Sequence, residues 1–208
     1  PEGVAMAARI RLSLQDGLFL RAETRETPVH VGGLQIFRIP PRAPAHFVAT
    51  LAARLRSYPV SVAPLNYRLA GGITGKVMPS WEVDPDVDVD YHFRHSALPS
   101  PGGEKELGML VSRLHSTPMD LTRPLWEYHL IEGLSGNRFA TYTKLHHAMF
   151  DGAAGMRLIN LSARRSTSNV PPFWADESRQ IKETAAAPES TLGQVPAIIE
   201  DGVKSLPG

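Results

Sequence analysis

One short stretch, residues 144–152 with the sequence KLHHAMFDG, constrains the fold more than any other part of the chain. Upstream, residues 138–143 alternate apolar and polar side chains, which is the period of a half-buried strand. Downstream, the apolar residues of 153–159 have helical spacing. Asp151 stands where a helix N-cap is expected, with Gly152 just inside the helix. The stretch therefore predicts a strand, a tight loop and a helix in succession.

This arrangement places His146 and His147 at the carboxyl end of a strand, where α/β folds commonly carry ligand-binding and catalytic groups. A neutral imidazole has a reference pKa of about 6.5 and can accept a proton near neutral pH. Asp151 could orient a ring, cap the helix or pair with an arginine, and Gly152 leaves room for a substrate or for close packing. The alternative is a pair of satisfied polar side chains followed by an ordinary Asp-Gly turn.

Three patterns that resemble metal sites do not meet the requirements of one. His146 and His147 are adjacent on a strand and cannot easily share an ion, and no HExxH motif is present. His92 and His95 lie three apart in a predicted strand, so they face opposite sides. The four aspartates of 84–90 do not match the EF-hand spacing, and we interpret them as a solvated loop or edge. The sequence thus predicts no metal site.

The periodicity elsewhere predicts helices at 12–24, 44–58 and 104–115 and strands at 29–39, 76–83, 91–98, 124–133 and 138–145. Residues 59–69 are predicted to be loop. Ser135-Gly136-Asn137 predicts a β-hairpin. Gly32-Gly33, inside a predicted strand, indicates either a bulge or a close backbone approach. We expect Trp126 to anchor the core rather than to contact a substrate.

Composition excludes several classes of function. A length of 208 residues suits one domain with an extension. Lys plus Arg total 22 against 21 for Asp plus Glu, so no basic field attracts nucleic acid. The absence of cysteine removes disulfides, thiolate metal sites and cysteine nucleophiles. No apolar run of about 18 residues and no signal peptide are visible. We expect a cytoplasmic protein, with peripheral contact to a membrane or lipid inclusion left open.

The character of the chain changes after Leu161. Residues 162–188 are rich in Ser, Thr, Pro and charge, as in a linker or crossing loop. Residues 171–174 within them, PPFW, are expected to dock against the protein, because aromatic side chains seldom lie free in solvent. Residues 191–206 carry a helical stripe of apolar side chains. The predicted organisation is a domain at 1–165, a linker or crossing loop at 166–190 and a connector helix at 191–208.

Three blocks in order carry a family resemblance: residues 28–34 (PVHVGGL), residues 123–126 (RPLW) and residues 146–156, which begin with HHxxxDG. Together they resemble the bacterial wax ester synthase/diacylglycerol acyltransferases. These enzymes belong to the HHxxxDG superfamily of CoA-dependent acyltransferases, with the chloramphenicol acetyltransferase-like enzymes and the condensation domains of peptide synthetases. The likeness extends from about Leu12 to Leu161.

The resemblance implies an α/β (α+β) fold of the chloramphenicol acetyltransferase type, with a mixed sheet flanked by helices. Enzymes of this superfamily have two such domains with the active-site tunnel between them. The sequence supplies the domain that carries HHxxxDG and no counterpart of the second. We therefore expect residues 1–208 alone to be an incomplete enzyme. We also expect its interdomain face to expose apolar surface for the C-terminal half of the enzyme, whether that half is on the same chain or on a separate one.

The resemblance further implies transfer of a long-chain acyl group from acyl-CoA to a fatty alcohol or diacylglycerol, with no cofactor. His147 is then the general base and His146 and Gly152 support the motif. Asp151 is structural and pairs with an arginine, for which Arg123 and Arg157 are the candidates.

Pro124, Leu125 and Trp126 belong to a family motif whose role the sequence leaves undecided. The sequence contains neither a cysteine nor a G-x-S-x-G motif, in agreement with direct transfer from the thioester. Two alternatives stay open. One is a condensation-type domain that uses carrier-protein thioesters, and the other is a non-catalytic lipid-binding or partner-binding domain of the same fold.

Overall fold

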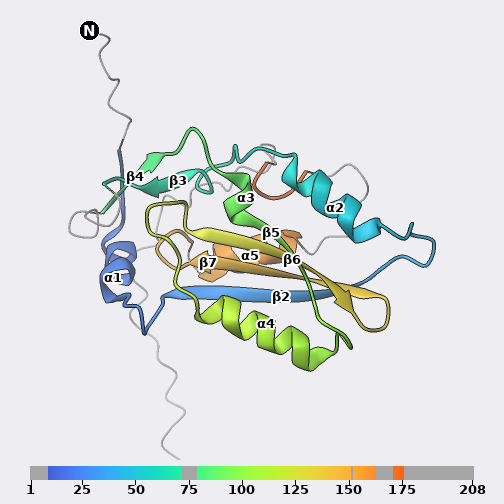
Figure 1. The fold of residues 1–208 in the computed structure, drawn as a ribbon. Coiled ribbons are helices and arrows are strands. Elements are labelled where there is room, and N and C mark those ends of the chain that lie inside the picture. Colours follow the sequence, from blue (N-terminus) through green and yellow to red (C-terminus); the bar gives the residue numbers. More distant parts are fainter. Residues whose placement is uncertain (1–8, 72–78, 151, 163–170, 176–208) are drawn as a thin grey trace, which may run out of the picture.

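The computed structural model describes residues 9–71, 79–150, 152–162 and 171–175 (Figure 1). The helices are α1 (Leu14–Ala22), α2 (Phe47–Arg56), α3 (Val89–His92), α4 (Glu104–Ser116) and α5 (Gly152–Ser162). The strands are β1 (Ile10–Arg11), β2 (His30–Arg38), β3 (Tyr67–Leu69), β4 (Ser80–Val83), β5 (Phe93–Ala97), β6 (Trp126–Leu134) and β7 (Arg138–His146).

The main sheet has four strands in the order β2-β7-β6-β5. The β2–β7 and β6–β7 pairs are antiparallel and the β5–β6 pair is parallel, so the sheet is mixed, as the family resemblance implies. The predicted hairpin joins β6 to β7, and its turn places Gly136 at φ 74° and Asn137 at φ 55°. A small sheet, β1-β4-β3, lies apart from the main one.

Both faces of the main sheet are covered, because β6 and β7 alternate their side chains between two clusters. One face packs α2, α5 and the 171–175 segment around Trp126, Leu130 and Leu145. The opposite face packs α4 around Ile131 and Tyr142. Figure 1 shows α4 and α5 on opposite sides of the sheet. Coverage on both faces explains why nearly every residue of β6 and β7 is buried.

The glycine pair in β2 makes room for a ring of the neighbouring strand on one face and for a helix on the other. β2 pairs with β7 without interruption from His30↔His146 to Arg38↔Arg138, so there is no bulge. A Cβ on Gly32 would overlap the Tyr142 ring, and one on Gly33 would lie 2.5 Å from Ile159 Cγ2 of α5. Of the two sequence interpretations, close backbone approach is the correct one.

The structure buries both faces of β7, although the alternation of 138–143 is typical of a half-buried strand. It also corrects the element boundaries in two places. The loop predicted at 59–69 ends in a short strand, β3, which pairs with β4. The strand predicted at 91–98 begins only at Phe93, because the Asp88 side chain accepts the Tyr91 N–H and starts helix α3. A three-residue strand such as β3 has too few residues to show a period of two, so the sequence carried no signal for it.

The predicted docking of the PPFW segment is confirmed. Trp174 is fully buried and stacks on Trp126 with ring centroids 5.7 Å apart. Its carbonyl oxygen accepts the backbone N–H of Ser61 at 3.0 Å. The predicted connector helix at 191–208, the Asp151 cap and residues 72–78 lie outside the described residues. Among the described residues, no helix combines the length and apolar character needed to cross a bilayer.

Candidate active site

The histidine pair lies where β7 ends and a tight loop begins. Strand β7 ends at His146, and the turn over residues 147–150 leads to α5. His146, Ala148 and Phe150 are buried, whereas His147 and Met149 are only partly buried. The loop therefore begins between the two histidines and sends their side chains into different surroundings. His147 is the one that solvent or a substrate can reach.

His146 is enclosed, held by two hydrogen bonds and approached by a carboxylate from a third element. Its side chain is completely buried, and its Nδ1 accepts the backbone N–H of Ala148 at 3.0 Å. Its Nε2 lies 3.4 Å from Oε2 of Glu23, a carboxylate at the end of α1 that is itself only 5% exposed. The backbone N–H of His146 donates to the carbonyl of Leu125 at 3.1 Å. This residue supports the loop from inside the protein.

His147 is positioned by contacts with two other segments. Its ring stacks on Phe19 of α1, with centroids 5.1 Å apart and an angle of 26° between the planes. Its backbone N–H donates to the carbonyl of Val29, just before β2, at 3.2 Å. A ring fixed by stacking and by its backbone can keep a nitrogen directed at a substrate, which is what a general base requires.

The Pro-Leu-Trp motif underlies this loop. Leu125 is fully buried in a second cluster with Leu20 and Ala148, and its carbonyl holds His146. Trp126 is fully buried, as predicted, and its indole N–H donates to the Leu65 carbonyl at 2.8 Å. Pro124 is buried too. Of the three, Leu125 contacts the histidine pair directly, through its carbonyl, and Trp126 pairs with Leu145 just before it. The geometry favours a supporting role.

Asp151 lies outside the described residues, so its arginine partner stays a prediction. Of the two candidates, Arg123 is already engaged elsewhere. Its guanidinium lies 3.2 Å from Asp88 and 3.7 Å from Asp120, and it stacks over the Tyr91 ring at 4.1 Å. The Arg123 charge also lowers the pKa of the Asp88 carboxyl.

Sequence reasoning missed two residues of the site, Glu23 and Phe19. Both lie on α1 or at its end, and both contact the histidine pair. Phe19 is one of several apolar residues in the helix predicted at 12–24, and Glu23 has no local pattern that distinguishes it from a surface acid. Only the approach of α1 to the end of β7 reveals them.

A second polar cluster lies beside the site, on the α4 side of the sheet. Lys144 is fully buried and donates to the carbonyl oxygens of Leu114 and Thr117 at the end of α4. Its Nζ lies 3.8 Å from Glu127, which in turn accepts from Nε2 of His129 at 3.0 Å. Burial lowers the pKa of Lys144. The cluster caps α4. Within the part of the chain that the structure describes, it makes no contact with His147.

No group of three potential metal ligands gathers within the described ranges. His92 and His95 are separated, as predicted, but not because they face opposite sides of one strand. His92 belongs to α3 and stacks on Trp126 at 4.5 Å, while His95 in β5 faces Glu132 at 3.4 Å. Asp86, Asp88 and Asp90 are exposed, as expected for a solvated segment.

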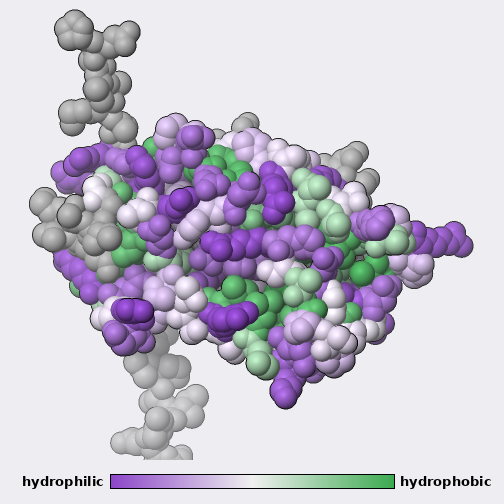
Figure 2. Space-filling view, in the orientation of Figure 1, coloured by the Kyte–Doolittle hydropathy of each residue, from purple (hydrophilic) through white to green (hydrophobic). Residues whose placement is uncertain are grey.

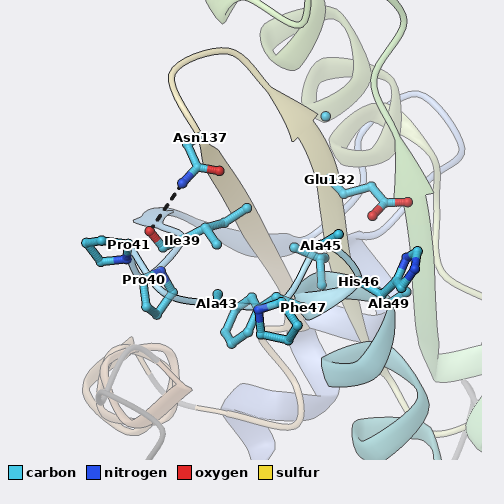
Figure 3. Close-up of a pocket in the computed structure, with 13 residues that line it drawn as sticks. Ile39, Pro40, Pro41, Ala43, Ala45, His46, Phe47, Ala49, Glu132 and Asn137 are labelled. Carbon is cyan, nitrogen blue, oxygen red and sulfur yellow. Dashed lines mark hydrogen bonds between the residues drawn. The ribbon is translucent and has the colours of Figure 1, made fainter.

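A pocket of about 390 Å³ lies at the other end of the sheet (Figure 3). Prolines 40, 41 and 44 with Phe47 line it, together with residues near the β6–β7 turn. In Figure 3, Asn137 Nδ2 donates to the Ile39 carbonyl at 3.5 Å. Because β7 runs from Arg138 beside this pocket to His146, the pocket is roughly 30 Å from His147 along the strand. It is not part of the histidine site.

Comparison with known proteins identifies a family. Residues 12–206 match the model of the wax ester synthase/diacylglycerol acyltransferase catalytic domain. The O-acyltransferase WSD of Acinetobacter baylyi is 42% identical over 193 residues, which are 91% of this chain and 40% of that protein. The probable diacylglycerol O-acyltransferase tgs2 of Mycobacterium tuberculosis is 43% identical over 171 residues, covering 76% of this chain and 36% of the relative.

Solved structures agree with the sequence relatives. The wax ester synthase/diacylglycerol acyltransferase from Marinobacter aquaeolei VT8 is 44% identical and superposes with a TM-score of 0.72 over 79% of this chain and 40% of that one. The first condensation domain of the calcium-dependent antibiotic synthetase, at 23% identity and a TM-score of 0.54, shares the fold alone. The chain thus spans about 40% of the length of the relatives that it matches.

Proposed function

Because the chain belongs to the wax ester synthase/diacylglycerol acyltransferase family, we propose that the protein moves a long-chain acyl group from acyl-CoA to a hydroxyl acceptor. The names of the relatives support a fatty alcohol or diacylglycerol as the acceptor, and hence a wax ester or triacylglycerol as the product. The condensation-type alternative is less supported, since that likeness is one of fold.

One observation about this chain carries the proposal: His147 is the partly exposed member of a histidine pair whose other member is sealed in the core. A base must reach its substrate, and it must be held in one orientation when the substrate arrives. His147 meets both conditions through its exposure and through its contacts with Phe19 and Val29.

The proposed reaction is a direct transfer. The unprotonated ring nitrogen of His147 takes the proton of the acceptor hydroxyl while the hydroxyl oxygen attacks the thioester carbonyl. The carbon–sulfur bond then breaks, and the thiolate of CoA leaves with the proton that the imidazolium returns. An ester and free CoA result, and His147 is again neutral. A thioester is already activated, so the reaction as proposed involves neither a covalent acyl-enzyme nor a resident cofactor.

We further propose that a C-terminal half, corresponding to the part of the relatives that this chain does not match, forms the other wall of the site. That half lies either on the same chain or on another one. Apolar side chains exposed on the described surface support this, and Figure 2 shows apolar patches interrupted by polar side chains on one face. The most exposed are Leu14 at 80%, Met109 at 65% and Leu18 at 54%. Leu14 and Leu18 lie on α1, the helix whose Phe19 touches His147. Peripheral contact with a lipid surface is an alternative role for Leu14 and Leu18.

The proposal is tested by replacing His147 with Ala in the full-length protein. General-base catalysis contributes roughly 10²- to 10⁴-fold, so we expect turnover to fall by at least about a hundredfold. The assay follows release of the CoA thiol from palmitoyl-CoA, with hexadecanol or diacylglycerol as acceptor. The two acceptors, compared side by side, define the acceptor class.

His46→Ala provides the control for loss of an imidazole. His46 is exposed near the N-terminus of α2, beside the pocket at the far end of the sheet, and we expect its replacement to leave turnover unchanged. A correctly folded His147→Ala protein with turnover near that of the parent would remove His147 from the role of base.

A further inference from the structure

We infer that Glu23 is a positioning residue for His147 and acts through His146, with Phe19 assisting from the preceding helical turn. This inference rests on the proposed function, because it concerns how the base of that reaction is held. Its structural basis is the end of α1, which contacts both histidines, one through a carboxylate and the other through an aromatic ring.

The Glu23 carboxylate lies in a place where a charge is costly. Its side chain is 5% exposed, and the imidazole of His146 opposite it is fully buried. A buried carboxylate is tolerated when polar partners compensate for lost hydration. The His146 Nε2 atom faces Oε2 at 3.4 Å, which is an ion-pair distance and not a hydrogen bond. The charge of Glu23 also acts on Lys144, where it opposes the lowering of the pKa by burial.

The tautomer of His146 links this carboxylate to the loop. Nδ1 accepts the backbone N–H of Ala148 at 3.0 Å, so this nitrogen carries a lone pair. The ring proton is therefore on Nε2, the atom that faces Glu23. An acceptor at position 23 stabilises this tautomer. Without it, the ring could place its proton on Nδ1, where it would repel the Ala148 N–H and displace the loop.

A displacement of Ala148 would also move His147, its neighbour in the chain. The His147 ring has its own restraint from α1, since Phe19 stacks on it at 5.1 Å. Phe19 and Glu23 are four residues apart, and the Glu23 N–H donates to the Phe19 carbonyl at 3.1 Å. Residues at this spacing lie on the same side of a helix. The end of α1 thus holds the two histidines as one unit.

The test compares kcat and KM of full-length Glu23→Ala and Glu23→Gln variants with palmitoyl-CoA as donor. We expect Glu23→Ala to lower kcat roughly ten- to hundredfold, because small misplacements of a catalytic group cost this much, and to leave KM for the acyl-CoA within about twofold. Gln keeps an oxygen that can accept from His146 Nε2, so Glu23→Gln should recover much of the lost kcat.

The chain offers a matched control in Glu127. It is also a buried carboxylate paired with a histidine, His129, at 3.0 Å, and it too lies near Lys144. Glu127→Ala should lower the melting temperature about as much as Glu23→Ala, with kcat nearly unchanged at a temperature where both variants are folded. Equal losses of kcat in the two variants would mean a general loss of stability and would overturn the inference.

The same assay separates the inference from the proposed function. If His147→Ala abolishes turnover while Glu23→Ala leaves kcat unchanged, the positioning role of Glu23 is wrong and the proposed base stands. If His147→Ala retains turnover, the proposed mechanism is wrong and the positioning role is overturned with it.

Discussion

At the scale of single residues, the sheet edge beside the histidine loop carries a partly buried imidazole, that of His30. His30 pairs in register with His146, and its Nε2 donates to the His115 carbonyl at 2.6 Å. Nδ1 of His115 in turn contacts the Tyr142 hydroxyl at 2.7 Å. Desolvation, with a further contribution from the Lys144 charge, lowers the pKa of His30 from 6.5 to about 4. This end of β2 therefore favours the neutral form of the His30 imidazole.

The lowered pKa predicts that the protein loses stability in mild acid. Between pH 6.5 and about 4 the unfolded chain binds a proton at His30 that the folded protein does not, so the free energy of unfolding falls as the pH falls and levels off below about pH 4. His30→Gln removes this titration and keeps a donor for the His115 carbonyl. Its melting temperature should decline less over this range than that of the parent, and an identical decline would contradict the prediction. Since burial also lowers the pKa of His92, a part of the decline should persist in the variant.

At the scale of elements, β2 is the strand that lets α5 pack closely over one face of the sheet. Its glycine pair admits the Tyr142 ring on one face and Ile159 of α5 on the other. α5 directly follows the histidine loop, so the depth to which α5 packs influences where the loop lies. A side chain at Gly33 would lift α5, the helix that begins at the last residue of the motif.

Gly33→Ala is therefore expected to destabilise the protein by about 1–3 kcal/mol, the usual range for overpacking a core. Urea denaturation of the parent and the variant measures the difference. Gly108→Ala is the control: a Cβ there meets nothing within 4 Å, and Ala favours the helix interior over Gly by about 0.5–1 kcal/mol. If Gly33→Ala is as stable as Gly108→Ala, α5 does not pack as closely as described.

At the scale of the whole molecule, a segment distant in sequence completes the main core. Residues 171–175 return to the sheet face that carries α2 and α5, and they add Phe173 and Trp174 to the cluster around Trp126. His92 stacks on the same indole from α3. Trp126 directly follows Leu125, whose carbonyl accepts the backbone N–H of His146. The aromatic cluster therefore fixes the start of β6, on which the position of His146 depends.

Replacing Trp174 with Ala should lower the free energy of unfolding by about 3–5 kcal/mol, as is usual for truncation of a buried aromatic residue. Trp174→Phe should cost less, because a ring would still pack against Trp126. Chemical denaturation followed by circular dichroism measures both changes. A loss below about 1 kcal/mol for Trp174→Ala would show that the segment adds little to the core.

The sequence by itself determined the parts of this protein that depend on neighbours along the chain. Alternation of apolar and polar residues predicted β7, turn residues predicted the hairpin with β6, and helical spacing predicted α4 and α5. The motif that follows β7 identified the family and pointed to His147 as the candidate base. These patterns are local because a strand or a helix buries one face at a fixed period.

Tertiary structure alone decided what surrounds the two histidines. It placed Glu23 against His146 and Phe19 against His147, and it engaged Arg123 with Asp88 rather than leaving it free for other acids. No periodicity records such contacts, because they join segments far apart in the chain and arise only when α1 packs against the end of the sheet. The sequence contains the groups that do the chemistry, and packing decides which of them are sealed, which are supported and which a substrate can reach.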